Sequence, residues 1–394
     1  MSSTPRKSAS TRSFASIVAV LGALALTACA ASEGGATAAS VGTYDEAELT
    51  SIVDQYLAEP TFTAPGDPID VSSLAGEKIY VIPFSDATEF NQIQAVGAKE
   101  AAEAAGVELI HYTTNGQASE WQQGMNKAIQ DDAAAIIIAG AEPTIIAPQI
   151  AEAEAAGIPV ILSHAVDTTA EQEIMETVPG ITATGARAPF GEAMRLVADY
   201  IALESKGAAK ILFVTADDMN SAPMWLGDAF NDEIAQRCPD CTVDRVSTTS
   251  AEAATKTQTA VQAALQTHPD TTWIVPMFDF LVPYIIPALE AANATETIKI
   301  GTFNGTASVL DLVREQNPPV VLDVGEPIEL MGWSTMDQTL RILLGEEPVE
   351  QTLYMRIFDE SNIADAGEPA STIAGYGDID AIKNGFRELW GVAG

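Results

Sequence analysis

Short apolar segments alternate with amphipathic ones along most of this chain. Residues 79–83 are continuously apolar and rich in β-forming side chains, which predicts a buried strand. A polar loop at residues 85–89 follows, and apolar side chains then recur at helical spacing as far as Gly106, a residue typical of a helix C-cap. Residues 107–112 again have the composition of a strand. The first unit is therefore strand, loop, helix and strand.

The alternation continues in two series. In the first, we expect helices at residues 118–130 and 143–156 and strands at 134–139, 158–162 and 181–184. In the second, we expect helices at 189–204, 224–236, 251–267 and 282–292 and strands at 210–215, 242–246, 273–276 and 298–302. Strands that alternate with helices of this length predict an α/β fold with two doubly wound parallel-sheet lobes. Because ligands bind at the carboxyl ends of parallel strands, residues 84–94 are expected to line a site.

Residues 1–28 have the pattern of an export signal. Three basic residues precede residues 14–26, an apolar stretch too short to span a bilayer as a mature helix. The stretch closes on Leu-Thr-Ala-Cys, which resembles the lipobox of bacterial lipoproteins, so we expect lipid on Cys29 and stable anchoring through several acyl chains. A plain secretory signal with an incidental cysteine is the alternative.

Residues 29–75 are expected to form a tether and an N-terminal arm. Residues 30–42 are small, polar and nearly uncharged, as in flexible linkers. Residues 44–59 have the spacing of a short amphipathic helix, and three prolines between residues 60 and 68 then impose an extended path. We expect this arm to lie on the main body.

The chain is strongly acidic, with 19 Lys and Arg against 55 Asp and Glu and a net charge of −36. Removing the three basic residues of the signal leaves 16 against 55, a net charge of −39. Such a surface repels nucleic acid and anionic headgroups, so we expect no nucleic-acid partner and membrane contact through the lipid alone. An export signal in place of a DNA-binding helix pair excludes a gene regulator.

Two cysteines remain besides Cys29, in the segment Cys-Pro-Asp-Cys. A redox motif or half of a zinc site has this spacing, but the sequence has no second cysteine pair and only three histidines. Exactly two remaining cysteines in an exported chain predict a structural disulfide between Cys238 and Cys241, with redox chemistry as the alternative. We expect no metal and no cofactor.

Several segments occur in a distinctive order. Residues 78–83, then Gly-Ala-Lys at 97–99, and later Ala-Gly-Ile-Pro-Val at 156–160 belong to the first series. His-Pro-Asp at 268–270 and Ile-Lys-Ile-Gly-Thr-Phe-Asn-Gly at 298–305 belong to the second. In this order they resemble ribose-binding-like proteins, the sugar-class substrate-binding proteins of ABC importers. The resemblance covers about residues 78–345, and it rests on order and spacing, since no single motif is specific.

The resemblance implies a periplasmic binding protein-like fold, with two lobes joined by a three-strand hinge and the ligand bound between them. We expect an N-terminal lobe of residues 76–183 plus 304–325 and a C-terminal lobe of 184–303 plus 326–394, with crossings near 181–186, 303–304 and 324–326. It further implies a monomeric, non-enzymatic protein outside the cytoplasm that captures a sugar or polyol by lobe closure and delivers it to an ABC importer permease.

The sequence departs from the family pattern where the family contacts its ligand. His164-Ala165 stands in place of a common Asp-Arg pair, and Ala186-Arg187 in place of Asp-Asn. Phe278 replaces the Asn of an Asn-Asp pair, and Asn304 replaces the Asp of Phe-Asp-Gly. An Arg usual after the sixth strand is missing from residues 217–227. By position, we expect ligand contacts from Phe90, Asn91, His164, Arg187, Asp217, Asn220, Trp225, Asp279, Asn304 and Glu326.

These residue types suit a polyhydroxy ligand, because aromatic rings cover its apolar face while carboxylates, amides and Arg bind its hydroxyls. Phe90, Trp225 and His164 are equally consistent with structural roles, and Asp217 with a helix cap. A sensor component that presents its ligand to a signalling receptor is consistent with the same sequence. A surface-anchored enzyme is the remaining alternative. The sequence argues against it, because it has no phosphate-loop, nucleophile-elbow or zinc-protease motif.

Overall fold

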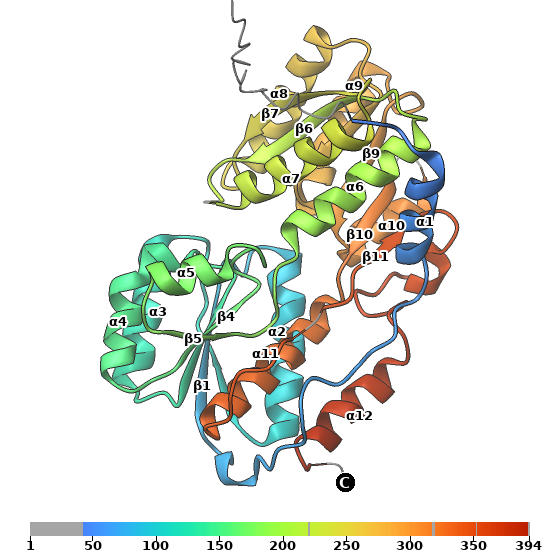
Figure 1. Ribbon diagram of the computed structural model, residues 1–394. Coiled ribbons are helices and arrows are strands. Elements are labelled where there is room, and N and C mark those ends of the chain that lie inside the picture. Colours follow the sequence, from blue (N-terminus) through green and yellow to red (C-terminus); the bar gives the residue numbers. More distant parts are fainter. Residues whose placement is uncertain (1–41, 220, 317–319, 352, 393–394) are drawn as a thin grey trace, which may run out of the picture. The chain divides into compact units, whose positions relative to one another are not determined.

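The computed structural model describes residues 42–394 except 220, 317–319, 352 and 393–394 (Figure 1). The export signal, Cys29, the tether as far as residue 41, and Asn220 therefore lie outside the described residues. Among the helices of the described part, none is both long and apolar enough to cross a bilayer.

The first lobe is built on a parallel sheet of five strands in the order β2-β1-β3-β4-β5 (Figure 1). The strands are β1 (Lys78–Pro83), β2 (Glu108–His111), β3 (Ala135–Ala139), β4 (Val160–Ser163) and β5 (Ile181–Thr184). Both faces are buried: Ile79 and Val81 pack on one side, Tyr80 and Ile82 on the other. This explains the continuous apolar run at β1, since successive side chains of a strand point to opposite faces.

Helices cover both faces of this sheet. They are α2 (Glu89–Ala105), α3 (Ala118–Gln130), α4 (Ala147–Ala155) and α5 (Glu171–Thr177), with α11 (Ile328–Leu343) and α12 (Ile379–Leu389) from the C-terminal part. Helices α2 and α11 cross closely at two glycines. A Cβ on Gly97 would lie 1.8 Å from the carbonyl oxygen of Glu329, and one on Gly332 would lie 2.1 Å from the backbone nitrogen of Ala98.

The second lobe has a six-stranded sheet in the order β11-β10-β9-β8-β6-β7, parallel except for the edge strand β11. Its strands are β6 (Lys210–Ala216), β7 (Thr242–Thr248), β8 (Trp273–Pro276), β9 (Lys299–Asn304), β10 (Val320–Gly325) and β11 (Arg356–Phe358). Its helices are α6 (Phe190–Glu204), α7 (Ala222–Arg237), α8 (Ala253–Thr267), α9 (Val282–Ala292), α10 (Ala307–Glu315) and the N-terminal α1 (Glu46–Leu57). Short 3-10 turns are η1 (Ser72–Leu74), η2 (Pro143–Ile146), η3 (Asp279–Leu281) and η4 (Ile363–Ala366).

The expected two-lobe α/β fold is confirmed, but two boundaries are wrong. Strand β10 pairs with β9 in the second sheet, so residues 304–325 do not return to the first lobe. Helix α11 packs on α2 and lies in the core of the first lobe, so residues 326–394 are not all in the second. The chain leaves β9 for α10 within one lobe, and the crossing expected at 303–304 is wrong. The passages near 181–186 and 324–326 do connect the two lobes: the first leads from β5 to α6 and the second from β10 to α11.

The predicted N-terminal arm joins both lobes. Asp45 caps α1, whose Leu49 and Val53 are buried in the core of the second lobe. The proline-rich segment then reaches the first lobe, where the backbone N–H of Ile69 donates to the carbonyl of Leu389 at the end of α12 (2.7 Å). The arm is therefore integral to the fold.

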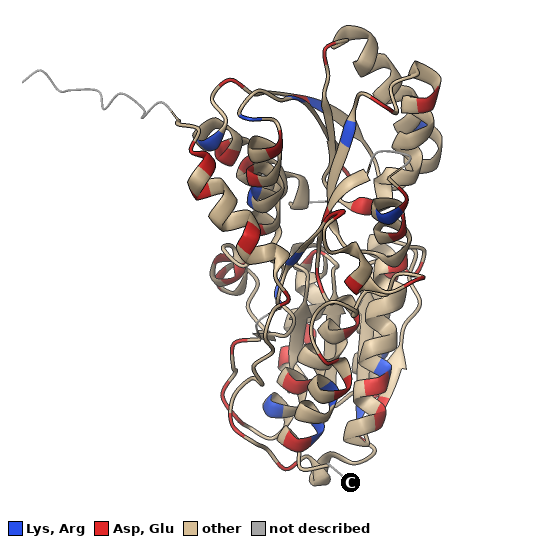
Figure 2. Cartoon of the chain, turned by 90° about the vertical axis from the view of Figure 1, so that its right-hand side faces the viewer, with Lys and Arg blue, Asp and Glu red and all other residues tan. Residues whose placement is uncertain are grey.

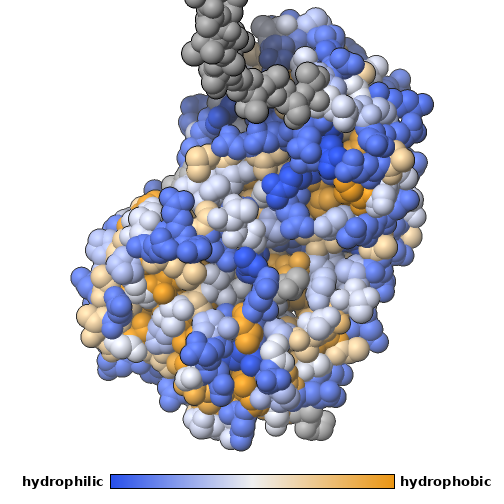
Figure 3. Space-filling view, viewed as in Figure 1, coloured by the Kyte–Doolittle hydropathy of each residue, from blue (hydrophilic) through white to orange (hydrophobic). Residues whose placement is uncertain are grey.

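Acidic residues outnumber basic ones over the surface, as Figure 2 illustrates. Apolar residues on the face in Figure 3 are scattered among hydrophilic ones. Among the described residues, the exposed large apolar side chains are those of Val96, Met175 and Met224. They lie on three different elements, α2, α5 and α7, so they do not form a shared stripe on one helix.

Candidate ligand site between the two lobes

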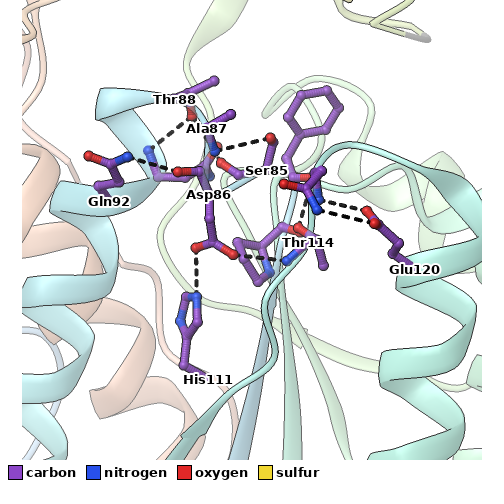
Figure 4. Close-up of polar contacts among 12 residues, drawn as sticks. Ser85, Asp86, Ala87, Thr88, Gln92, His111, Thr114 and Glu120 are labelled. Carbon is purple, nitrogen blue, oxygen red and sulfur yellow. Dashed lines mark hydrogen bonds and ion pairs between the residues drawn. The ribbon is translucent and has the colours of Figure 1, made fainter.

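The loop between β1 and α2 is held in place by Asp86 (Figure 4). One carboxylate oxygen lies 2.7 Å from Nε2 of His111, and the other accepts a hydrogen bond from the backbone N–H of Thr114 (2.9 Å). Thr88 caps α2 and also donates its hydroxyl to the side-chain oxygen of Asn91 (2.7 Å). The loop thereby fixes the first turn of α2, which carries Phe90.

The side chains of His164 and Glu326 pair with each other. His164 follows β4 with a left-handed backbone (φ 49°), and its backbone N–H donates to the carbonyl of Ala186 (2.6 Å). Its Nε2 lies 3.1 and 3.2 Å from the two carboxylate oxygens of Glu326, which is fully buried. We expected both residues to contact the ligand. Their contact links the end of β4 in the first lobe to the segment after β10 in the second.

Aromatic rings from both lobes meet beside this pair. The His164 ring lies 5.0 Å from that of Phe90 in the same lobe and 5.0 Å from that of Phe190, the first residue of α6. The ring of Phe190 then contacts three rings of the second lobe, at centroid distances of 5.7 to 6.4 Å: Trp225, Phe278 and Phe303. We refer to these six residues, Phe90, His164, Phe190, Trp225, Phe278 and Phe303, as the interlobe ring cluster.

Two buried aspartates hold the loop that follows β9. Asp279 accepts hydrogen bonds from the backbone N–H (2.8 Å) and hydroxyl (2.6 Å) of Thr306, and Asp323 accepts one from the N–H of Gly305 (3.1 Å). Burial raises the pKa of Asp279 to about 7 and that of Asp323 well above its ordinary value. The loop begins at Asn304, whose φ of 136° is rare for a residue with a side chain. Its carbonyl accepts the N–H of Glu326 (3.2 Å).

A further polar contact joins the lobes at the start of two helices. Glu89 in the first turn of α2 accepts hydrogen bonds from the hydroxyl (2.6 Å) and backbone N–H (3.3 Å) of Ser308 in α10. The sequence analysis did not single out Glu89 or Phe190 as contacts. A signal existed for both, since Glu89 lies within residues 84–94, which are expected to line a site, and Phe190 lies at the start of the helix expected from residue 189.

Other predicted contacts have partners elsewhere. The guanidinium of Arg187 is bound to Glu171 (3.1 Å) and to Glu350 (2.7 Å). Asp217 accepts hydrogen bonds from Thr215 (2.6 Å) and from Arg245 (2.6 Å) within the second lobe. Of the predicted contact residues, four lie together at the interlobe ring cluster, with Asn304 beside them: Phe90, His164, Trp225 and Glu326. Four others form hydrogen bonds or ion pairs with other side chains of the protein: Asn91, Arg187, Asp217 and Asp279. Their ligand contacts stay predictions.

The cysteine pair forms a disulfide in the structure. Cys238 and Cys241 have Cα atoms 5.3 Å apart and close a short loop at the end of α7. Within the described residues, no group of three or more His, Cys, Asp or Glu side chains is arranged to hold a metal ion.

Comparisons with known proteins agree with this architecture. A model of the periplasmic binding protein domain matches residues 79–347. The D-apiose import binding protein of Paraburkholderia graminis is 27% identical over 280 residues, which are 68% of this chain and 82% of that protein.

Solved structures have the same fold. The 5-methylthioribose transporter solute binding protein from Thermotoga lettingae is 17% identical, with a TM-score of 0.66 over 82% of this chain and 100% of that one. A solute binding protein from Agrobacterium vitis with bound allitol is 16% identical, with a TM-score of 0.65 over 75% and 99%. At these identities the likeness concerns the fold alone.

Proposed function

Because this chain belongs to the periplasmic binding protein domain family, we propose that it captures a small sugar or polyol between its lobes and delivers it to the permease of an ABC importer. The observation that carries the proposal is the interlobe ring cluster, which brings aromatic rings of both lobes together beside His164 and Glu326. Relatives named for D-apiose import, for 5-methylthioribose transport and for bound allitol support the ligand class.

The mechanism follows from the two-lobe arrangement. Rings cover the apolar face of the ligand, and the polar edges of His164, Glu326 and Asn304 bind its hydroxyls. A ligand that touches both lobes stabilises the closed state over the open one, because only the closed state satisfies both sets of contacts. The bond between Glu89 and Ser308 forms in that same closed state, so it adds to the stability of closure.

We also propose that the protein works as a monomer outside the cytoplasm, anchored through lipid on Cys29. The location and the anchor rest on the sequence pattern at residues 1–29, and the monomeric state rests on the family resemblance. Changing Cys29 to Ser is expected to release the protein from salt-washed membranes or to leave it as precursor. Membrane attachment that survives both the substitution and the wash contradicts the anchor.

A ligand screen tests the central proposal. Melting temperature is measured with a panel of sugars and polyols, with nucleosides and amino acids as comparison classes, and hits are titrated by calorimetry. Binding to the folded state raises the melting temperature, and we expect hits among sugars or polyols. The ligand must be recovered chemically unchanged, since turnover indicates an enzyme. Hits confined to amino acids contradict the proposed ligand class.

A further inference from the structure

A groove of about 590 Å³ lies between the edge strand β2 and helix α3 of the first lobe. Its volume is in the range of small-ligand sites, about 300–1,000 Å³. The floor comes from one face of the sheet, where Tyr80 and Ile110 are partners in register and Tyr112 lies two residues further on. The wall is a polar stripe of α3 with the spacing of one helix face: Gln123, Asn126, Lys127 and Gln130. We refer to this hollow as the β2–α3 groove.

The ring of Tyr112 is held against α3. A Cβ on Gly124, inside this helix, would lie 2.8 Å from Cδ1 of Tyr112, so glycine is what allows the ring to approach the helix so closely. Glycine inside a helix lowers its stability, and the contact with the ring explains its presence here. The backbone N–H of Tyr112 also donates to the carbonyl of Val81 (2.9 Å). The half-buried ring is therefore fixed in the groove without a ligand.

The groove has hydrogen-bonding groups to spare. The hydroxyl of Tyr80 and the ammonium of Lys127 both bind Asp131, which neutralises the lysine. Within the described part of the chain, no hydrogen bond engages the three carboxamides of the groove or the hydroxyl of Tyr112. Among the described residues that line the groove, none is Asp or Glu, although the chain has 55 of them. The groove is thus an uncharged, amide-rich surface on an acidic protein.

A chain of neutral sugar residues matches these groups. Its hydroxyls both donate and accept hydrogen bonds, as carboxamides do, and its apolar ring faces can pack on the ring of Tyr112 and on Ile110. Nucleic acids and anionic glycans are repelled by the net charge of −36. Apart from Tyr80, the side chains that line the groove are half-buried or exposed, so the groove is open and can admit part of a longer chain.

We propose that the β2–α3 groove is a second carbohydrate site, which holds a neutral oligosaccharide. Tyr112 supplies the ring on which a sugar packs, and Asn126 and Gln130 bind its hydroxyls. The site goes beyond the proposed function and does not depend on it, because its residues all belong to the first lobe and none is in the interlobe ring cluster.

Calorimetric titration of the full chain with maltohexaose, cellohexaose and the hexamer of N-acetylglucosamine tests the proposal. We expect at least one of them to bind saturably. Tyr112→Ala and the double variant Asn126→Ala/Gln130→Ala should each weaken that binding tenfold or more. A small sugar found by the ligand screen should bind both variants as it binds the wild type.

Two controls match these variants outside the groove. Tyr284→Ala removes a half-buried tyrosine of α9, and Gln266→Ala an exposed carboxamide of α8, both in the second lobe. Neither should change the affinity for the hexasaccharide. Melting curves establish that each variant folds. If Tyr112→Ala does not fold, the double variant decides, since its two side chains are half-buried or exposed.

Three results overturn the proposal. The first is that none of the hexasaccharides binds the wild type. The second is that one binds, but equally well to the wild type and to the groove variants, which places it elsewhere on the protein. The third is that an uncharged peptide of alternating Thr and Val binds in place of the hexasaccharides and is lost in the same variants, which makes the groove a peptide site at the edge of β2. Failure of the small-sugar screen alone contradicts the proposed function and leaves the groove site standing.

Discussion

Glu89 of α2 and Ser308 of α10 join the two lobes through hydrogen bonds to the hydroxyl and the backbone N–H of Ser308. A carboxylate at the N-terminus of a helix is stabilised by unpaired N–H groups and by the helix dipole. Because each helix belongs to a different lobe, this interaction exists only while the lobes are together. Under the proposed lobe closure, this contact lies outside the ring cluster, so it can be changed without altering the rings.

Glu89→Ala should weaken ligand binding by about two- to fivefold, since an exposed interaction of this kind contributes roughly 0.5–1 kcal/mol. The melting temperature of the ligand-free protein should change little. Glu103→Ala, at the exposed far end of the same helix, serves as control. Calorimetry gives the affinity and small-angle scattering the lobe separation. Unchanged values of both in Glu89→Ala contradict a role in closure.

The His164–Glu326 pair should contribute strongly to stability. His164→Asn tolerates the left-handed backbone but leaves the fully buried Glu326 carboxylate without its imidazole partner. Leaving a buried polar group without its hydrogen-bond partner costs about 1–3 kcal/mol, and more for a charged group, whereas Glu326→Gln keeps a polar side chain facing His164 and should cost less. Urea unfolding of both variants measures the difference. Equal losses of unfolding free energy in the two variants, or a loss below about 1 kcal/mol for His164→Asn, contradict a stabilising role for the pair.

Asp279 should make stability depend on pH. Burial raises its pKa to about 7, above the ordinary value of 3.8. Between about pH 4 and pH 7, therefore, Asp279 is protonated in the folded state and ionised in the unfolded state. The contribution to stability is full at the acidic end, falls as the pH rises through this window, and is constant above it.

The comparison with Asp279→Asn isolates this effect from the repulsion of the acidic surface. The free energy of unfolding of the wild type minus that of Asp279→Asn should fall from pH 4 to pH 7. The negative charge of Asp279 also raises the pKa of Asp323, so the change in stability belongs to both carboxyl groups together. A difference that is constant or rises with pH rejects the prediction. Asp279→Ala should lose stability, because Thr306 loses its acceptor.

Removing the disulfide should have a modest effect. A double change of Cys238 and Cys241 to Ser opens a very short loop, so the loss of unfolding free energy should be about 2 kcal/mol or less. Thermal unfolding with and without reductant measures it. Free thiols on the exported, unreduced wild-type protein contradict the disulfide.

Trp390→Ala should severely destabilise the first lobe. Trp390 is fully buried, stacks on Trp333 (5.5 Å, 11°), and donates its ring N–H to Asp337 (2.8 Å). Truncating a buried Trp costs about 3–5 kcal/mol, and Trp390→Phe should lose less because most of the ring area remains. Urea unfolding compares them. Similar small losses in both variants contradict a central role for α12 in this core.

Local pattern was enough to locate many helices and strands. The predicted bounds of α3, β8 and α9 agree with the structure because apolar runs and amphipathic spacing are properties of neighbouring residues. The same reasoning predicted α1 and the two α/β lobes. Beyond residue 302 the sequence analysis assigned no elements, and the lobe boundaries there were wrong.

Those errors have a long-range cause. An apolar strand such as β10 has the same local pattern whichever sheet it joins, and only its pairing with β9 decides. Likewise, α11 joins the first lobe because Gly97 and Gly332 allow two backbones distant in sequence to meet. Neither partner is visible in a local pattern.

The candidate site shows the same difference between what a local pattern predicts and what tertiary contacts decide. Chain position identified Phe90, His164, Trp225 and Glu326, since each lies near the end of a strand or the start of a helix. It did not reveal that His164 and Glu326 bind each other, that Arg187 is held by Glu171 and Glu350, or that Phe190 links the rings of both lobes. The sequence determined which side chains are available at the strand ends. Tertiary structure decided which remain for a ligand, because hydrogen-bond partners are set by distance in space.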